Sequence, residues 1–190
     1  MDDGFVGFAR HKLSVDDYYR MADAGILGRD DRVELIDGEL IEMSPIGPDH
    51  AATVDGLNYS LVVACGTTAI VSPQNPVRLD GFNEPQPDFA VFFPRIDKYR
   101  RGPRPSPAET LLVVEVADSS IRYDQTIKLK LYAKAGIAEY WIVDLHRRVL
   151  LAHRQPEGDA YTVIETFHAG DRVALSKAPG ISVVLDRVFD

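Results

Sequence analysis

Three stretches of the chain are mostly apolar without alternating with polar residues, which is typical of strands buried on both faces. Residues 89–93 read FAVFF, residues 111–117 read LLVVEVA, and residues 138–145 read AEYWIVDL. Prolines at positions 85, 87 and 94 flank the first stretch. Since proline cannot donate a hydrogen bond to a sheet, they mark the ends of the predicted strand. Together with a proline-broken strand upstream, the pattern predicts sheet strands at 68–73, 88–93, 111–117 and 139–144.

Three other stretches predict helices. Residues 14–25 begin at Ser14, a residue type that caps helix N-termini, and acidic residues follow it in the first turn. Residues 48–65 and 120–136 are the other two, and a glycine ends each of them. The second helix has an apolar stripe, which consists of Val54, Leu57, Leu61 and Cys65.

Two hairpins are predicted in addition to these strands. Residues 32–45 contain Asp37-Gly38, a dipeptide that favours a two-residue type I′ turn, and such a turn pairs Glu34 with Ile41. Towards the C-terminus, a second hairpin is expected around 156–158, followed by short strands up to Val184.

These elements predict a mixed α/β (α+β) fold, with a mixed β-sheet core flanked by helices and with hairpins near both termini. The length of 190 residues is enough for one domain with a sizeable core, and we expect that domain to span residues 1–190.

Composition and charge narrow the functional classes. Hydrophobic residues make up 45% of the chain and charged residues 26%, which is ordinary for a soluble protein, and no apolar run approaches the roughly 20 residues of a membrane span. The acidic N-terminus lacks the apolar region of a secretion signal, and Cys65 alone cannot form an intrachain disulfide or a cysteine zinc cluster. We therefore expect a cytoplasmic protein that does not bind membranes.

The net charge of −8 argues against a strongly basic nucleic-acid-binding surface, because such surfaces neutralise phosphates. It does not exclude an enzyme that contacts phosphates locally through a metal ion.

Two acids stand out against their apolar surroundings. Asp88 opens the FAVFF strand, and Glu115 lies in the middle of LLVVEVA. An acid at the start of a strand, such as Asp88, is commonly exposed to solvent and has no functional role. A buried carboxylate such as Glu115 must be protonated, paired or bound to a cation, so an ion pair with Arg78 or Arg122 is the structural alternative.

The helix at 120–136 adds a cation. At roughly 100° per residue, Lys128 and Asp124 fall on the same arc as the apolar residues that we expect to face inward. Those apolar residues are Ile127, Leu131 and Ala135. Lys130 falls on the opposite side and should face water. Lys128 either covers apolar surface with its stem, pairs with Asp124, or reaches the same place as Asp88 and Glu115.

If these three charges meet, their chemistry fits phosphodiester hydrolysis. Two carboxylates from neighbouring strands bind a hard divalent cation through oxygen. A cation polarises a phosphoryl oxygen and lowers the pKa of water, and a nearby ammonium stabilises the developing negative charge.

The order Pro-Asp, buried acid, helical lysine resembles the PD-(D/E)XK nuclease superfamily, and within it the Uma-type family of "putative restriction endonucleases". The matching stretches are ELIDGELIEMSPIGPDH, QNPVRL, EPQPDFAV, LLVVEVADSS and YDQTIKLKLYAKAGIAEYWIVDL, which run from about Glu34 to Leu145. The resemblance implies a restriction-endonuclease-like core, in keeping with the fold predicted above.

The resemblance also implies roles for individual residues. Asp88 and Glu115 match the two acids, which would hold Mg²⁺ or Mn²⁺ as metal ligands, with the Val116 carbonyl as a further contact. In the wider superfamily the lysine comes two residues after the second acid, where this chain has Ala117. In the Uma-type pattern it has moved to the following helix, where Lys128 matches it.

One further catalytic position and three accessory positions complete the predicted site. Glu34 is expected among the catalytic residues, although a solvated hairpin residue would look the same in sequence. His50 matches a family position near the site or simply caps or precedes a helix. Gln74 matches a polar position on the preceding strand, and Asp124 lies on the same side of its helix as Lys128. The chain departs from the family at 118–120, where Asp-Ser-Ser replaces the usual Ser-Pro-Ser, so we expect the local loop geometry to differ there.

The function predicted on these grounds is a Mg²⁺-dependent endonuclease that hydrolyses nucleic-acid phosphodiester bonds, with DNA favoured over RNA and a homodimer expected. One alternative is a catalytically inactive binding or regulatory module with the same fold, since fold alone does not establish activity. Another is an acid/base enzyme for a small molecule, which would need a closed pocket.

Overall fold

The computed structural model describes residues 9–28, 30–101 and 104–189. The expectation about a secretion signal concerns residues 1–8, which lie outside the described residues, as do the end points of the predicted domain. The helices and strands, in chain order, are α1 (Val15–Asp23), β1 (Val33–Ile36), β2 (Glu39–Glu42), α2 (Pro48–Cys65), β3 (Ile70–Pro73), β4 (Phe89–Phe92), η1 (Pro107–Glu109), β5 (Thr110–Ala117), α3 (Ile121–Tyr123), the π-helical η2 (Asp124–Lys128), α4 (Leu129–Lys134), β6 (Glu139–Asp144), β7 (Val149–Glu157), β8 (Ala160–Phe167), β9 (Arg172–Leu175) and β10 (Ala178–Val184).

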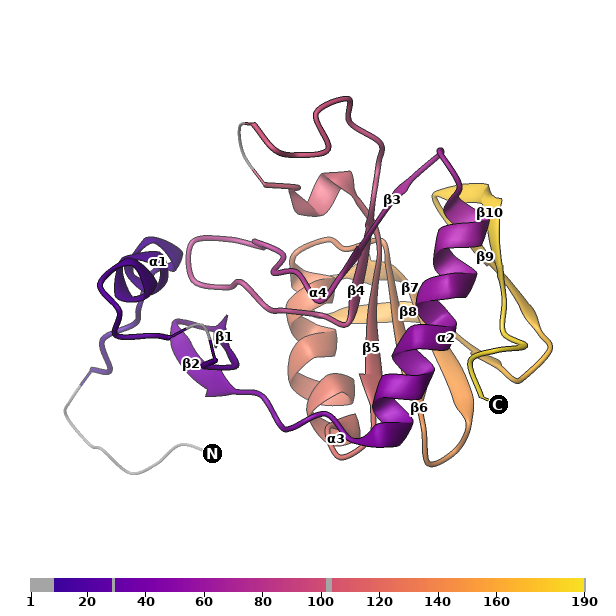
Figure 1. Cartoon of the computed structure of the whole chain (residues 1–190), viewed down its shortest axis with the longest axis horizontal. Coiled ribbons are helices and arrows are strands. Elements are labelled where there is room, and N and C mark those ends of the chain that lie inside the picture. The colour runs from indigo at the N-terminus through magenta and orange to yellow at the C-terminus, as the bar shows by residue number, and fades with distance from the viewer. Residues whose placement is uncertain (1–8, 29, 102–103, 190) are drawn as a thin grey trace.

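Helix α1 and the β1–β2 hairpin form an N-terminal unit beside the main sheet (Figure 1). Ser14 caps α1 as predicted, in a reciprocal capping box with Asp17. The hairpin turns at Asp37 and Gly38, whose φ values of 51° and 76° are those of a type I′ turn, and the predicted pairing of Glu34 with Ile41 is confirmed.

The central sheet has six strands in the order β3-β4-β5-β6-β7-β8. Strands β5 and β6 are parallel, and the α3–η2–α4 segment connects them, because a parallel pair needs a crossover. The other neighbouring pairs are antiparallel. The mixed sheet and the four strands predicted within it are confirmed.

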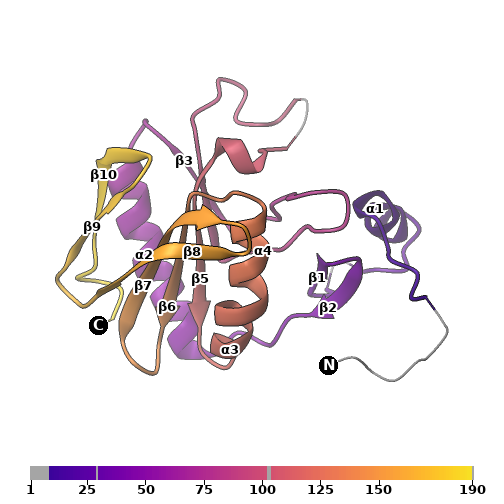
Figure 2. The same cartoon turned by 180° about the vertical axis from the view of Figure 1, so that it is seen from behind.

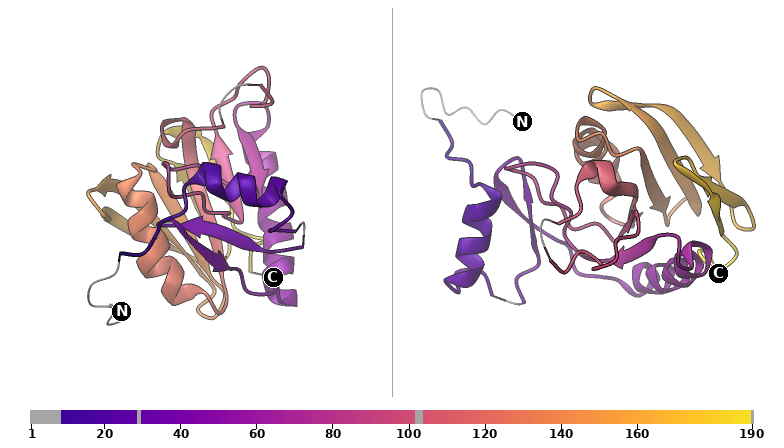
Figure 3. Two further views of the ribbon diagram at one scale, coloured as in Figure 1. Left: turned by 90° about the vertical axis from the view of Figure 1, so that its left-hand side faces the viewer. Right: turned by 90° about the horizontal axis from the view of Figure 1, so that it is seen from above.

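Each face of the sheet has its own apolar cluster. Helix α2 and the β9–β10 hairpin cover one face, where Leu57, Leu61 and Cys65 of the predicted α2 stripe are buried and Val54 is partly buried. The α3–η2–α4 segment covers the other face, where Tyr132 packs. Figures 2 and 3 show the same arrangement from behind, from the side and from above. Burying a Leu or Val side chain in this way stabilises the fold by about 1.5–3 kcal/mol.

Strand alternation decides where the acid of β5 points. Val114 and Val116 belong to the cluster under α2, whereas Val113 and Ala117 belong to the cluster under the α3–η2–α4 segment. Because side chains alternate along a strand, Glu115 points to the same side as Val113 and Ala117. It therefore faces η2, which carries Lys128.

The prediction that Ile127 faces inward is wrong: its side chain is 47% exposed. Residues 124–128 form a turn of π-helix, which takes more residues per turn than the α-helix assumed in the count. Asp124 and Lys128 are nevertheless buried as expected, and Lys130 is exposed.

None of the helices in the described part of the chain combines the length and the apolar character that a membrane crossing needs.

Candidate active site

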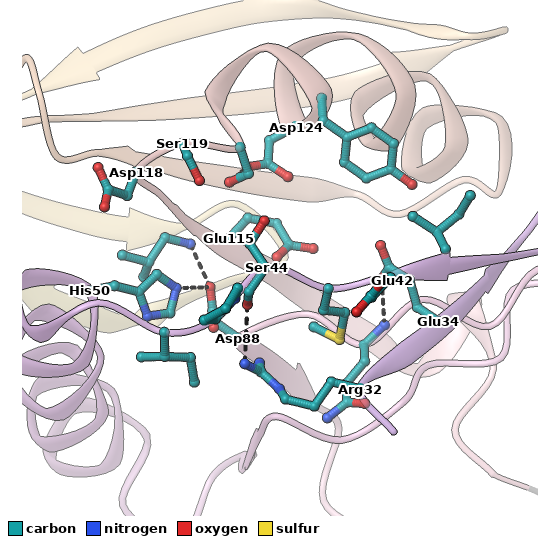
Figure 4. A pocket seen from close by; sticks show the side chains of 18 of the residues that line it. Arg32, Glu34, Glu42, Ser44, His50, Asp88, Glu115, Asp118, Ser119 and Asp124 are labelled. Atoms are coloured by element: carbon teal, nitrogen blue, oxygen red, sulfur yellow. Dashed lines mark hydrogen bonds and ion pairs between the residues drawn. The ribbon is translucent and has the colours of Figure 1, made fainter. Parts of the chain in front are cut away.

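A cavity of about 380 Å³ opens where β5 ends. The β1–β2 hairpin, the N-terminal end of α2, the residues before β4, and η2 all contribute side chains to it (Figure 4). Of the predicted site residues, seven line this cavity, namely Glu34, His50, Asp88, Glu115, Val116, Asp124 and Lys128. Segments far apart in sequence therefore meet in one place.

Asp88 is held in a fixed orientation immediately before β4. Its Oδ2 atom accepts a hydrogen bond from the Val116 backbone N–H at 2.8 Å, and His50 Nε2 lies 3.2 Å from the same atom. The hydrogen bond to Asp88 raises the pKa of His50, although partial burial opposes this. His50 occupies the first turn of α2, so the helix start predicted from sequence and the contact with Asp88 are both present.

Glu115 and Lys128 form a buried ion pair. Lys128 Nζ lies 2.9 Å from Glu115 Oε1, and the Tyr132 hydroxyl donates to the same oxygen at 2.9 Å. The structural alternatives for Glu115 are wrong, because Arg78 pairs with Asp16 at 3.2 Å and Arg122 is exposed.

Glu34 is the second partner of Lys128. Its Oε2 atom lies 3.2 Å from Lys128 Nζ and accepts a hydrogen bond from the Gln86 backbone N–H at 3.1 Å. Only 3% of the Glu34 residue is exposed, so it is not a solvated hairpin residue.

Asp124 lies near this pair without bonding to it. The Ser120 hydroxyl donates to Asp124 Oδ2 at 2.6 Å, and no ion pair joins Asp124 to Lys128 among the described residues. Burial raises the pKa of Asp124 to about 6, against the opposing charge of Lys128.

The electrostatic balance of the cavity favours added positive charge, which either protons or a cation can supply. Burial is the main cause that raises the pKa of Glu115 well above its usual value; Lys128 acts against it, and the neighbouring Asp124 reinforces it. Burial opposes the charge of Lys128, but the Glu115 and Glu34 carboxylates outweigh it and raise the pKa of Lys128. Lys128 therefore stays protonated. The acids outnumber it, and either protons or a bound cation relieve their repulsion.

Each of the four acids presents one free oxygen. Asp88, Glu115, Glu34 and Asp124 use a single oxygen for all their hydrogen bonds and ion pairs within the described residues. Their other oxygens are Asp88 Oδ1, Glu115 Oε2, Glu34 Oε1 and Asp124 Oδ1, and none of these is a fully buried, unpartnered atom. Four carboxylate oxygens therefore remain accessible to a ligand in the cavity.

Residues 15–186 match the model of the Uma2 family, described as "Putative restriction endonuclease". The chain belongs to the Uma2 family. The family resemblance seen in the sequence is thereby confirmed.

A solved structure supports the fold of this Uma2 chain. This chain is similar in structure to a protein from Anabaena variabilis ATCC 29413, whose crystal structure is described as that of "a putative nuclease belonging to DUF820". The TM-score is 0.69 and the sequence identity 15%, with 93% of this chain and 97% of that chain covered. At this identity the similarity shows the fold alone. No curated protein matches the chain.

Gln74, the remaining predicted site residue, does not line the cavity. Its side chain is exposed and is not part of the cavity lining. Its backbone instead supports Asp88, because the Gln74 N–H donates to the Asp88 carbonyl at 2.9 Å, with a φ of 49° at Gln74.

Sequence reasoning missed several residues of this Uma2 site. Tyr132 bonds Glu115, Ser120 bonds Asp124, and Arg32 lines the cavity mouth. Tyr132 follows Lys128 by one helical turn, a spacing that was available as a signal. Nothing local in the sequence marks Arg32, because its place depends on how the hairpin docks.

The donor set fits a hard divalent cation. Asp88 and Glu115 each offer a free carboxylate oxygen, and Mg²⁺ is commonly bound by one or two carboxylates together with water and substrate phosphate. Within the described residues, no group of three or more His, Cys, Asp or Glu side chains is arranged to hold a metal by itself. If Asp88 and Glu115 each gave one oxygen to such an ion, water and substrate would supply its other ligands.

Proposed function

We propose that this protein is a metal-dependent endonuclease that hydrolyses phosphodiester bonds of nucleic acid, with DNA as the substrate ahead of RNA. The observation that carries the proposal is the meeting of Asp88, Glu115 and Lys128 in one cavity, with free carboxylate oxygens beside a protonated ammonium. Family membership supports the same reaction class.

Asp88 and Glu115 are the proposed ligands for Mg²⁺ or Mn²⁺, with the Val116 carbonyl as a further contact. Restriction-endonuclease-like proteins generally use divalent metals, and such an ion polarises a phosphoryl oxygen and lowers the pKa of its bound water. His50 and the Val116 N–H hold Asp88 in orientation, which reduces the cost of reorganisation during the reaction.

Lys128 has an electrostatic role in this proposal. Its raised pKa means that it keeps its proton at neutral pH, so it is suited to stabilising phosphate charge rather than to removing a proton from water. Glu34 and Glu115 fix its position from two sides. Asp124 is the accessory acid whose pKa, raised to about 6, suits proton transfer near neutral pH.

Cleavage assays on plasmid DNA, single-stranded DNA and RNA, with Mg²⁺ or Mn²⁺, test the proposal. We expect Asp88→Asn and Lys128→Met to lose at least about a hundredfold in rate, because each removes charge that acts on the transition state. Lys130→Met is the matched control, since Lys130 is exposed on the same helical segment and, among the described residues, forms an ion pair with Asp159 alone.

Equal cleavage by the wild type and both site variants would identify a contaminant and end the proposal. Folded protein without cleavage of any substrate would favour the inactive binding module.

The homodimer and the cytoplasmic location stay predictions. Strand β8 is an edge of the six-stranded sheet, and Ile164 on it is 59% exposed. We propose this edge of the C-terminal hairpin for pairing with a second copy, because an open strand edge is a template for another strand.

A further inference from the structure

The acids of the candidate site lie at the bottom of a walled cavity. Glu34, Glu115 and Asp124 are 3%, 5% and 2% exposed. The β1–β2 hairpin forms one wall, and residues 43–47, which connect this hairpin to α2, line the cavity beside it (Figure 4). A phosphate must therefore enter the cavity to reach the acids.

The cavity is small for a polymer. Its volume of about 380 Å³ is near the lower end of the range of small-molecule pockets, about 300–1,000 Å³. Such a space suits one or two nucleotide units of a strand. The space is too small for the full width of a duplex, so a duplex would have to present one of its strands to it.

The charge of the lining also opposes a duplex. Six acids line the cavity, and Arg32 and Lys128 are the two permanently charged cations among its lining residues. A duplex carries one negative charge per about 1.7 Å of its axis, against one per about 3.4 Å for a single strand. A single strand therefore meets less repulsion from the same lining.

Arg32 is the cation placed to meet substrate first. Lys128 is held between Glu34 and Glu115, whereas Arg32 is exposed at the cavity mouth beside Ser44 (Figure 4). Its Nη1 atom donates to the Ser44 carbonyl at 3.1 Å, and its other guanidinium N–H groups have no partner among the described residues. A guanidinium held this way presents free donors to a phosphate.

We propose that the cavity accepts a single unpaired nucleic-acid strand in preference to an intact duplex, and that Arg32 binds a phosphate of this strand at the mouth. This inference rests on the proposed nuclease function, because it assigns the substrate of the same site. The preference follows from the walls, the volume and the charge of the cavity, and the role of Arg32 from its free donors.

Binding measurements without metal separate this inference from catalysis. A labelled DNA oligonucleotide, single-stranded or annealed to its complement, is titrated with the wild-type protein in EDTA, and its fluorescence anisotropy is followed at several salt concentrations. We expect the single strand to bind at least about tenfold more tightly than the duplex. The same two substrates are then assayed for cleavage with Mn²⁺.

Arg32→Gln tests the phosphate contact, because glutamine removes the charge and keeps a polar N–H group at this position. We expect weaker binding of the single strand. The magnitude of the slope of log K against log salt should fall by about 0.7, which is the change expected when one phosphate contact is lost. Arg172→Gln, at an exposed arginine of β9, should leave both quantities unchanged.

The outcomes distinguish the two proposals. Equal or tighter binding of the duplex, or cleavage of intact duplex as fast as the single strand, overturns the inference and leaves the nuclease function standing. Preferential binding of the single strand without any cleavage supports the inference and contradicts the nuclease function. No binding to either substrate, or an unchanged salt slope in Arg32→Gln, overturns the inference.

Discussion

His153 on β7 is a buried base without a hydrogen-bond partner at either ring nitrogen within the described residues. Its ring packs against Tyr140 and Tyr161, with its centroid 6.0 Å from each of theirs. Burial lowers the pKa of His153 to about 4, whereas in the unfolded chain it is about 6.5. The unfolded state therefore binds more protons between these pH values, and stability falls as pH falls from about 6.5 through 4.

Replacing His153 with Phe should remove this acid sensitivity. Between pH 7 and pH 5 we expect the free energy of unfolding of the wild type to fall by roughly 2 kcal/mol more than that of His153→Phe. Urea unfolding at the two pH values measures the difference. The comparison isolates His153, because the raised pKa values of Glu115 and Asp124 act in the opposite direction in both proteins. Identical pH dependence in the two proteins would show that His153 does not titrate in this way.

At the scale of elements, the sequence predicts the helices, strands and turns whose formation depends on residues close together in the chain. The β1–β2 turn, the apolar stripe of α2 and the buried strands follow from dihedral preference and periodicity. The inward position predicted for Ile127 failed because a π turn depends on tertiary contacts. In η2, for example, the Tyr140 hydroxyl donates to the Asp124 carbonyl at 3.3 Å. No local residue pattern specifies that contact.

The β1–β2 turn also offers a test of how closely this hairpin packs. A Cβ at Gly38 would lie 2.6 Å from Lys12 Cβ, whereas one at Gly158, in the β7–β8 turn, would meet nothing within 4 Å. Both glycines have positive φ, so Gly158→Ala should cost about 1–2 kcal/mol for the backbone alone. Gly38→Ala should cost about 1–3 kcal/mol more, because Lys12 must move. Urea unfolding of the two variants measures this, and equal losses would contradict the packing at Gly38.

Across the whole molecule, contacts between distant segments build the candidate site. Asp88, Glu115 and Lys128 were predictable because each is a charge in apolar surroundings. The pairing of Lys128 with Glu34 was not, because it depends on how the N-terminal unit docks, and the sequence carries no periodic signal for docking. The Leu35–Glu84 bridge and the hydrogen bond between Tyr19 and Glu84 hold the same unit to the rest of the chain.

These contacts support the prediction that residues 1–190 form one domain. We expect the amides of β1 and β5 to exchange hydrogen with similar free energies, because the N-terminal unit should open only when the sheet unfolds. Native-state hydrogen exchange measures both. Exchange of β1 at much lower free energy than β5 would indicate a separately unfolding unit.

The central claim is that Asp88 and Glu115 hold a divalent cation beside Lys128, and calorimetric titration with Mn²⁺ near neutral pH tests it most directly. We predict one saturable site in the wild type, its loss in Asp88→Ala and Glu115→Gln, and its retention in Gln74→Ala, whose side chain lies outside the cavity. Absence of binding in the wild type, or equal binding in all four proteins, would contradict the claim.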